Sequence, residues 1–164
     1  MKNAFLITIA LVTALGLYSG DAIGATIDRV IAYIDNTAIT MRELDAEHNK
    51  NLPYFPSRTR KQTLEAMINT SLMLQDARRL HLLAKDDDEL LQKYLDLKIR
   101  ALVLVSEKDI SAYFSENRAR FGKRSLRELK PELRTYLEEL RFNIALKEHI
   151  SALRETAVIK IISY

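Results

Sequence analysis

Two β-branched segments stand at opposite ends of this chain, and most of the sequence between them has helical spacing. The first, TIDRVIAYID, ends at the turn signal Asp35-Asn36, and the second, AVIKIISY, closes the chain. An isolated strand is not stable in water, so each of these segments needs a partner. We therefore expect strands over 27–34 and 157–162 to pair, which brings the two ends of the chain together.

The middle of the chain is predicted to be helical, because it combines helical apolar spacing with only four Gly and three Pro. A short return strand is expected at 38–40. The expected fold class is mainly α, a helical bundle closed by a small β-sheet of N- and C-terminal strands. Helices are predicted at 40–49, 58–82, 85–105, 107–118 and from Pro131 through Leu153.

Capping signals mark several of the expected helix starts. Thr40 with Glu43, and Ser106 with Asp109, have the spacing of a capping box, in which side chains satisfy the free backbone N–H groups of the first turn. Ser57 is expected to cap the long helix, since Pro53 and Pro56 break the chain just before it. That helix is apolar over more than one face, which is typical of the centre of a bundle or of a partner-binding surface.

The starts of two further helices allow more than one interpretation. The acidic run Asp86–Glu89 suits a helix N-terminus, and the alternative of a calcium site lacks the Gly and the alternating ligand spacing of a calcium loop. Pro131 is expected in the first turn of the last helix, where its missing N–H has no consequence. Ser125 with Glu128 is expected to cap a separate turn.

The first 24 residues have the pattern of a cleaved signal peptide. Lys2 precedes an apolar run over 4–18, and small residues follow it, with cleavage expected after Gly24 or after Ala25. The alternative of an uncleaved anchor requires about 20 apolar residues, and this run is shorter. We therefore expect an exported, periplasmic protein whose residues 25–164 form one domain. Its net charge of +3 does not indicate nucleic-acid binding.

Catalytic signals are sparse. The chain has no Cys, no Gly-rich phosphate loop and none of the common hydrolase or metalloprotease motifs. Its three histidines, His48, His81 and His149, lack metal-ligand spacing and are expected to be structural. We therefore expect a binding protein rather than an enzyme, with no cofactor and no metal ion.

The segment VSEKDISAYFSENRARF, residues 105–121, resembles the segment before the isomerase domain in SurA-like and PrsA-like exported foldases. Residues 27–44 resemble the opening strand, turn and helix of the SurA N-terminal domain, and residues 146–163 resemble its last helix and closing strand. Many members of that family carry a parvulin-type isomerase domain between the last two helices. Here only residues 122–130 separate Phe121 from Pro131, too few to fold as a domain.

The resemblance implies the chaperone core of that family without its isomerase, a helical body in which N- and C-terminal segments are woven together. Such a protein holds unfolded envelope or outer-membrane polypeptides outside the cytoplasm without ATP. A dedicated assembly subunit for one exported partner, and an enzyme with a degenerate active site, are the alternatives. The terminal strands are able to pair within one chain or between two, so a monomer and a swapped homodimer both stay open.

The candidate client-binding residues are adaptable apolar side chains in the segment around Pro53 and Pro56 and on the long helix predicted at 58–82. The alternatives are that both methionines are core residues and that the two aromatic rings only fold onto the bundle. Tyr113, Phe114 and Phe121 are expected in the core. The candidates are Leu52, Tyr54, Phe55, Met67 and Met73.

Overall fold

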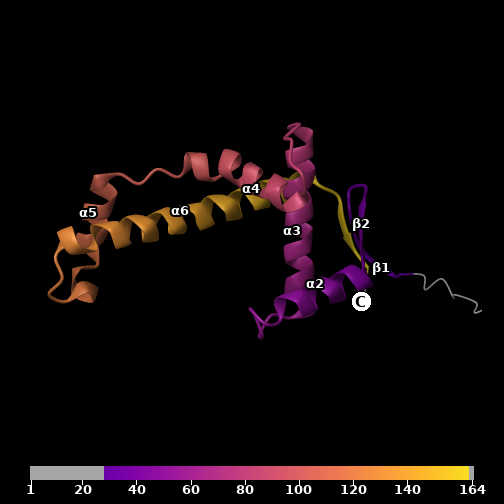
Figure 1. Ribbon diagram of the computed structural model, residues 1–164, viewed down its shortest axis with the longest axis horizontal. Helices are drawn as coiled ribbons and strands as arrows, with labels where there is room; N and C mark the ends of the chain where they lie inside the picture. The colour runs from indigo at the N-terminus through magenta and orange to yellow at the C-terminus, as the bar shows by residue number, and fades with distance from the viewer. Residues whose placement is uncertain (1–27, 163–164) are drawn as a thin grey trace, which may run out of the picture.

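The computed structural model describes residues 28–162, so the predicted signal peptide lies outside the described residues. The expected fold class is confirmed, because helices dominate and a small antiparallel sheet joins strands from both ends of the chain (Figure 1). In chain order the elements are β1 (Val30–Ile34), β2 (Thr37–Thr40), α2 (Met41–Asn51), α3 (Arg60–Arg79), α4 (Asp87–Lys98), the 3-10 turn η2 (Arg100–Leu102), α5 (Glu107–Glu116), the 3-10 turn η3 (Arg118–Phe121), α6 (Leu126–Thr156) and β3 (Ile159–Ile161).

The sheet has the strand order β2-β1-β3, with all neighbours antiparallel. β1 and β2 form the expected hairpin, in which Asp35 adopts a positive φ of 49° at the turn. β1 pairs with β3, and Tyr33 lies opposite Lys160. The Asp35 carboxylate also accepts a hydrogen bond from the Val158 N–H at 2.9 Å, so the turn itself is fastened to the start of the last strand. The predicted pairing of the two ends is confirmed.

One apolar core lies between the sheet and the helices α2 and α3. Leucine and isoleucine side chains from all three elements are almost fully buried there, and Leu153 and Ala157 from the end of α6 pack against them. Leu153 also contacts a second cluster, in which α3, α4 and α6 meet around Tyr94. The C-terminal part of α6 is therefore part of the core and ties the helices to the sheet.

A third cluster lies apart from these two. α5 and the first half of α6 pack together through Ile110, Leu129, Leu133 and Leu137, with the ring of Phe114 stacked on that of Phe121 beside them at 5.5 Å between centroids. We call residues 100–145 the arm and the other described residues the body. Figure 1 shows the arm projecting from the body, with α3 running across the end of α6. The helices are therefore not all gathered around one core.

The three predicted core aromatic residues, Tyr113, Phe114 and Phe121, are half-buried against this third cluster. Gly122 follows Phe121 with a φ of +57°, a conformation that side chains with a Cβ disfavour, and it reverses the chain toward α6. The connection between α5 and α6 is thus a tight turn of a few residues.

Several helix starts differ from the prediction. α3 begins after Thr59 rather than Ser57, because Gln62 completes a capping box with Thr59: the Thr59 N–H donates to the Gln62 side chain at 2.8 Å. The predicted capping boxes at Thr40 and Ser106 are confirmed, and the Asp86 carboxylate caps α4 by accepting the Glu89 N–H at 2.9 Å.

The prediction for Pro131 is wrong. α6 begins at Leu126, because the Ser125–Glu128 capping box starts this helix instead of a separate turn, and Pro131 therefore lies inside it. A proline there leaves the Arg127 carbonyl without its helical N–H donor. Both residues are exposed, so the break in the hydrogen-bond ladder lies on the solvent side of α6, where water is available to that carbonyl, and the helix continues.

The predicted helix over 85–105 also ends early, at Lys98. A 3-10 turn and the extended residues 103–105 follow it and lead to α5. Val103 and Val105 are β-branched and favour an extended backbone, and Arg134 of α6 donates to the Val105 carbonyl at 3.0 Å. Contacts with α6 thus replace the helical hydrogen bonds of this segment.

Tyr94 joins three helices through a buried hydrogen-bond network. Its hydroxyl donates to the Asp76 carboxylate of α3 at 2.7 Å and lies 2.5 Å from Nε2 of His149 on α6. Since the Tyr94 hydroxyl donates its proton to the hydrogen bond with Asp76, Nε2 of His149 is the donor in the second hydrogen bond, and the Tyr94 oxygen accepts. Burial lowers the pKa of His149 and raises that of Tyr94. His48 is likewise structural, with Nδ1 lying 3.0 Å from the Thr63 hydroxyl.

Replacing Lys160 by proline should destabilise the fold through the β1–β3 ladder. The Lys160 N–H lies on the side that faces Tyr33, because Val158 and Ile162 form hydrogen bonds with β1 on either side of it. The free energy of unfolding should fall by about 1–3 kcal/mol, measured by urea denaturation. Ile161→Pro is the control, since its N–H points to the open side of β3, and an equal loss in both variants would contradict the assignment.

The His149 contact predicts a pH-dependent stability. Because burial lowers the pKa of His149 in the fold, the unfolded chain binds its proton more readily. The contribution is present above the ordinary histidine pKa of about 6.5 and is lost as the pH falls below it. Thermal unfolding should therefore show a lower midpoint at pH 5.5 than at pH 7.5, with a smaller decrease in His149→Gln. The same decrease in both proteins would refute this origin.

Candidate functional site

The predicted candidates Leu52, Tyr54 and Phe55 lie together on the loop between α2 and α3. Leu52 is half-buried, while Tyr54 is 78% exposed and Phe55 is 49% exposed. The Phe55 carbonyl accepts the Arg58 N–H at 3.0 Å, and the Arg58 guanidinium lies 4.5 Å from the centre of the Phe55 ring. One face of Phe55 is therefore occupied by a cation, and Tyr54 is the most accessible ring of the loop.

The two predicted methionines occupy different places on α3. Met67 is half-buried and packs against the sheet core, whereas Met73 is 6% exposed and belongs to the cluster around Tyr94. Six residues along an α-helix correspond to a rotation of about 240° past one full turn, so the two side chains face different neighbours. The structure does not bring Met73 to the surface that carries the other candidates.

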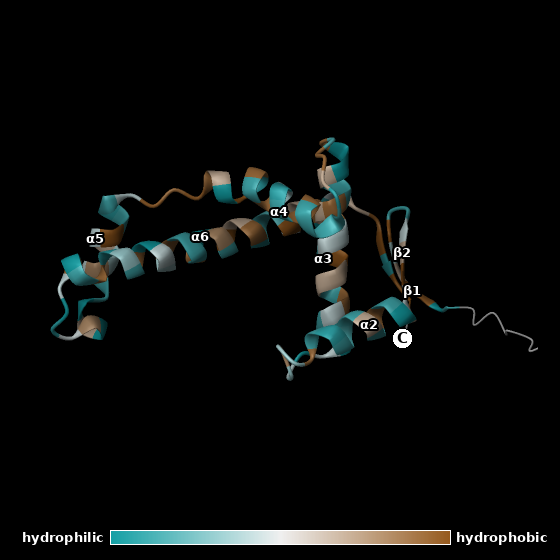
Figure 2. Ribbon diagram, in the orientation of Figure 1, coloured by the Kyte–Doolittle hydropathy of each residue, from teal (hydrophilic) through white to brown (hydrophobic). Residues whose placement is uncertain are grey.

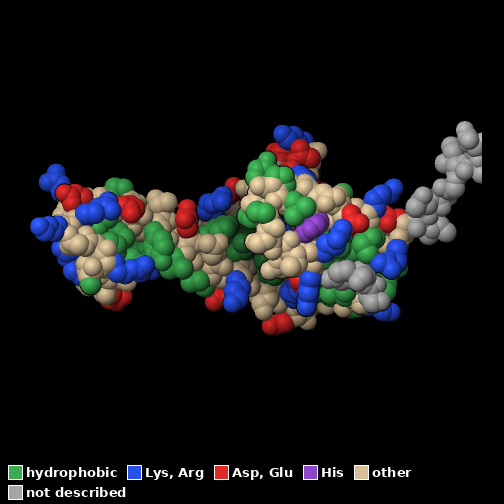
Figure 3. All heavy atoms as spheres, turned by 90° about the horizontal axis from the view of Figure 1, so that it is seen from below, with side chains coloured by type: hydrophobic (Ala, Val, Ile, Leu, Met, Phe, Trp, Pro, Cys, Tyr) green, Lys and Arg blue, Asp and Glu red, His purple; other side chains and the backbone are tan. Residues whose placement is uncertain are grey.

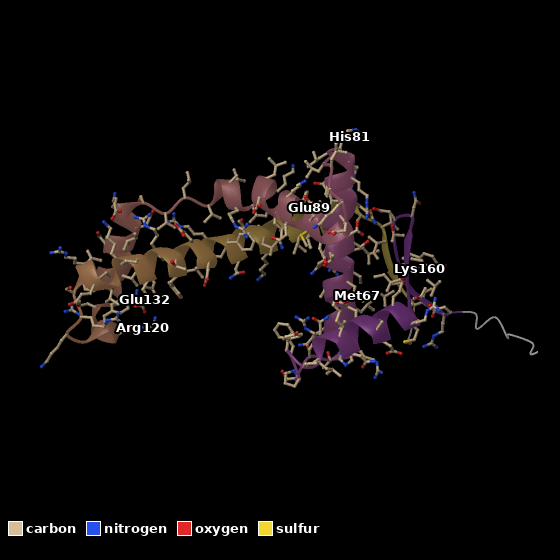
Figure 4. The ribbon with its side chains drawn as sticks, viewed as in Figure 1. Met67, His81, Glu89, Arg120, Glu132 and Lys160 are labelled. Atoms are coloured by element: carbon tan, nitrogen blue, oxygen red, sulfur yellow. The ribbon has the colours of Figure 1, made fainter. Side chains whose placement is uncertain are left out.

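A groove of about 510 Å³ runs along α3 beside Met67. Its floor is formed by small and hydroxyl-bearing side chains of α3, among them Ala66, Thr70 and Ser71, and α2 forms one wall. Figure 4 shows Met67 on α3 above α2, on the opposite side of the molecule from Arg120 and Glu132 on the arm. Arg58 lines this groove and also a smaller hollow beside Phe55, so the Tyr54–Phe55 loop adjoins the groove.

The arm carries a second apolar surface, which the prediction did not include. Tyr136, Leu140 and Ile144 are spaced four residues apart on α6 and are 44%, 40% and 50% exposed. Leu102 and Leu104 of the η2–α5 segment, also on the arm, are 73% and 77% exposed. Figure 2 shows apolar residues in brown on the extended segment before α5 and on α6, and Figure 3 shows apolar side chains along the face of the arm that is seen from below.

Ion pairs and main-chain bonds hold this surface in shape. Arg141 of α6 donates to the Leu104 carbonyl and pairs with Asp109 at 2.8 Å, and Arg134 pairs with Glu107. Hydrogen bonds from Ser106, and then from Arg141, hold the pKa of Asp109 well below its usual range. Because the guanidinium groups bind the carbonyls of the extended segment, the leucine side chains next to them are left toward solvent.

Between the extended segment and α6 lies a hollow of about 620 Å³. It is bordered by Val103 and Phe142 together with polar side chains of α6, and Arg100 lies 5.3 Å from the centre of the Phe142 ring. The residues that line the hollow are mainly polar and do not include Tyr136, Leu140 or Ile144, so this hollow is distinct from the apolar stripe.

Sequence periodicity alone does not distinguish the exposed α6 stripe from the buried face of the helix. Tyr136, Leu140 and Ile144 have the same spacing as the buried Leu129, Leu133 and Leu137. The distinguishing signal is length: α6 has 31 residues, and α5 has 10. A short helix cannot cover the whole apolar face of a long one.

Comparison with protein-family models and with curated proteins finds no match for this chain. Within residues 28–162 no helix is long and apolar enough to cross a membrane. The same residues contain no group of three metal-binding side chains.

Alanine substitution should separate the buried from the exposed side of the arm helix. Leu133→Ala should lower the free energy of unfolding by about 2–5 kcal/mol, since Leu133 is 3% exposed and its removal leaves a cavity. Leu140→Ala should cost about 1 kcal/mol at most, because much of its side chain already meets water. Urea unfolding checks both variants, and similar losses would mean that the Leu140 stripe is covered in solution.

Proposed function

We propose that this chain is an ATP-independent chaperone that holds unfolded exported polypeptides, with outer-membrane proteins as the main clients, in the periplasm. The observation that carries the proposal is the exposed apolar stripe of Tyr136, Leu140 and Ile144 on α6, together with the exposed Leu102 and Leu104 on the same arm. Exposed apolar surface beyond scattered single residues is typical of a protein-binding site. The proposal is also supported by the resemblance of residues 27–44, 105–121 and 146–163 to SurA-like foldases.

The physics of the arm suits binding and release without a nucleotide. Each exposed side chain contributes a modest apolar area, and the burial of such area stabilises a complex by about 25 cal/mol per Å² before the cost of ordering the client is subtracted. Several such contacts give weak, reversible binding. A folded client no longer offers its apolar side chains, so its release follows from its own folding.

The proposal includes no isomerase activity. α5 and α6 are joined by η3, Gly122 and residues 123–125, which form a turn rather than a domain. The groove beside α3 and the Tyr54–Phe55 loop lie on the body, and we assign them a supporting part in client binding. Met73 is left out of the proposed surface because the fold covers it.

The experiment is an aggregation assay without nucleotide, in which a urea-unfolded outer-membrane barrel protein and an unrelated unfolded enzyme are diluted separately into the chaperone. The protein should suppress light scattering for both. The triple variant Tyr136→Ser, Leu140→Ser, Ile144→Ser should lose most of this effect at equal concentration. Its control replaces Glu139, Asn143 and Lys147 by serine, because these exposed residues have the same spacing on another face of α6.

Equal suppression by the two triple variants would overturn the assignment to the arm. Failure of the folded, unaltered protein to protect either client would overturn the general-chaperone proposal. Selective protection of a single exported protein would favour a dedicated assembly subunit instead.

A further inference from the structure

The outer side of β2 forms an open edge of the sheet. The strand order β2-β1-β3 leaves β2 with one neighbour among the described residues. Two hydrogen bonds define which residues of β1 face β3: the Asp35 N–H donates to the Val158 carbonyl at 2.9 Å, and the Ile162 N–H donates to the Ile31 carbonyl at 2.8 Å. In an antiparallel ladder the bonding direction alternates, so odd-numbered residues of β1 face β3.

The even-numbered residues of β1 consequently face β2. Ile34 lies opposite Thr37 and Ala32 lies opposite Ile39, which makes these the hydrogen-bonded pairs of the β1–β2 ladder. The residue between them, Ala38, directs its N–H and C=O away from β1.

Thr40 supports this assignment independently. Thr40 is two residues after Ala38, so its N–H points to the same side of the strand as that of Ala38. This N–H points away from β1 and donates to the Glu43 carboxylate at 2.8 Å. Ala38 is exposed, and among the described residues its backbone makes no hydrogen bond to a side chain or across a turn. One donor and one acceptor with strand geometry are therefore available at this edge.

The groove beside α3 opens along the same edge. Thr37, Ala38 and Ile39 line it on the β2 side, and Thr70 and Ser71 line it from α3. A volume of about 510 Å³ is within the range of sites that bind a small ligand or a few side chains. A chain lying along β2 would place alternate side chains into this groove and the others into solvent, because successive side chains of a strand point to opposite faces.

We infer that the Ala38 edge of β2 and the adjoining groove bind one extended segment of an unfolded polypeptide as an added β-strand. The inference rests on the proposed function and specifies how a client is held on the body. The free N–H and C=O recognise main chain, which every client has, so this mode of binding does not depend on the client's sequence. It also leaves the arm free to contact apolar side chains of the same client.

Side-chain burial distinguishes a client from a second copy of this chain. In a symmetric β2–β2 pair the partner strand would turn Ile39 toward the groove, but Ile39 is 5% exposed and its side chain is held in the core of its own subunit. A client segment has free side chains, which fill the groove. Glu43 and Glu47 of α2 border the groove next to the β2 edge, so we expect neutral or basic residues in the part of the segment that lies beside them.

The test uses a labelled peptide of alternating Tyr and Thr residues with Lys at both ends, and its binding is followed by fluorescence anisotropy. Ala38→Pro removes the edge N–H without touching the β1 ladder, and it should weaken binding about tenfold, as expected for the loss of one or two main-chain hydrogen bonds. Ile161→Pro removes an outward N–H from β3, the other edge strand of the sheet, and is the matched control, with unchanged affinity. A peptide with alternate backbone N–H groups methylated on its pairing side should also bind about tenfold more weakly.

Hydrogen exchange of the unaltered protein gives a second readout that does not depend on a variant folding. The Ala38 amide should become protected when the peptide is added, while exposed amides on the far side of the sheet should not. Unchanged exchange at Ala38, or equal binding by Ala38→Pro, would overturn the edge-strand inference even if the arm variant loses binding. Absence of any peptide binding by the unaltered protein would overturn both this inference and the proposed function.

Discussion

The antiparallel pairing of β1 with β3 requires α6 to end beside the strand that begins the described chain. This requirement determines the position of the helix, since Leu153 contacts both body clusters and Arg154 pairs with Glu65 of α3 at 2.7 Å. The Tyr94 hydroxyl adds a contact with His149 one turn earlier. One end of α6 is thereby held in the body by strand, apolar and polar contacts together.

Because α6 is held at one end and is about 46 Å long, the rest of the helix has to project. α5 covers its first turns, and the body covers its last. Between these two parts, α6 is flanked by the extended segment 103–105. Arg134 and Arg141 of α6 donate hydrogen bonds to the backbone carbonyls of this segment. The exposed stripe of the arm is thus a consequence of helix length, and the proposed client-binding surface follows from the same geometry as the closure of the fold.

Most of the local structure could be predicted from the residues. The β-branched segments near the two ends form strands, and Thr40 and Ser106 cap the helices α2 and α5, as their residue types predict. The misplaced starts have a common cause: when several polar residues precede a helix, the one that forms the complete capping box begins it. Thr59 with Gln62 therefore starts α3 in place of Ser57, and Ser125 with Glu128 starts α6 despite Pro131 in its second turn.

The amino-acid sequence by itself determined the strands, the helix caps and the apolar periodicity, because these depend on neighbours a few residues away. Only the tertiary structure decided which apolar faces are covered. Met73 is buried and Met67 borders a groove, although both lie on one apolar helix, and Leu133 is enclosed while Leu140 is exposed on another. The open edge at Ala38 depends on strand order as well. Burial and edge exposure are relations between distant segments, which local periodicity does not encode.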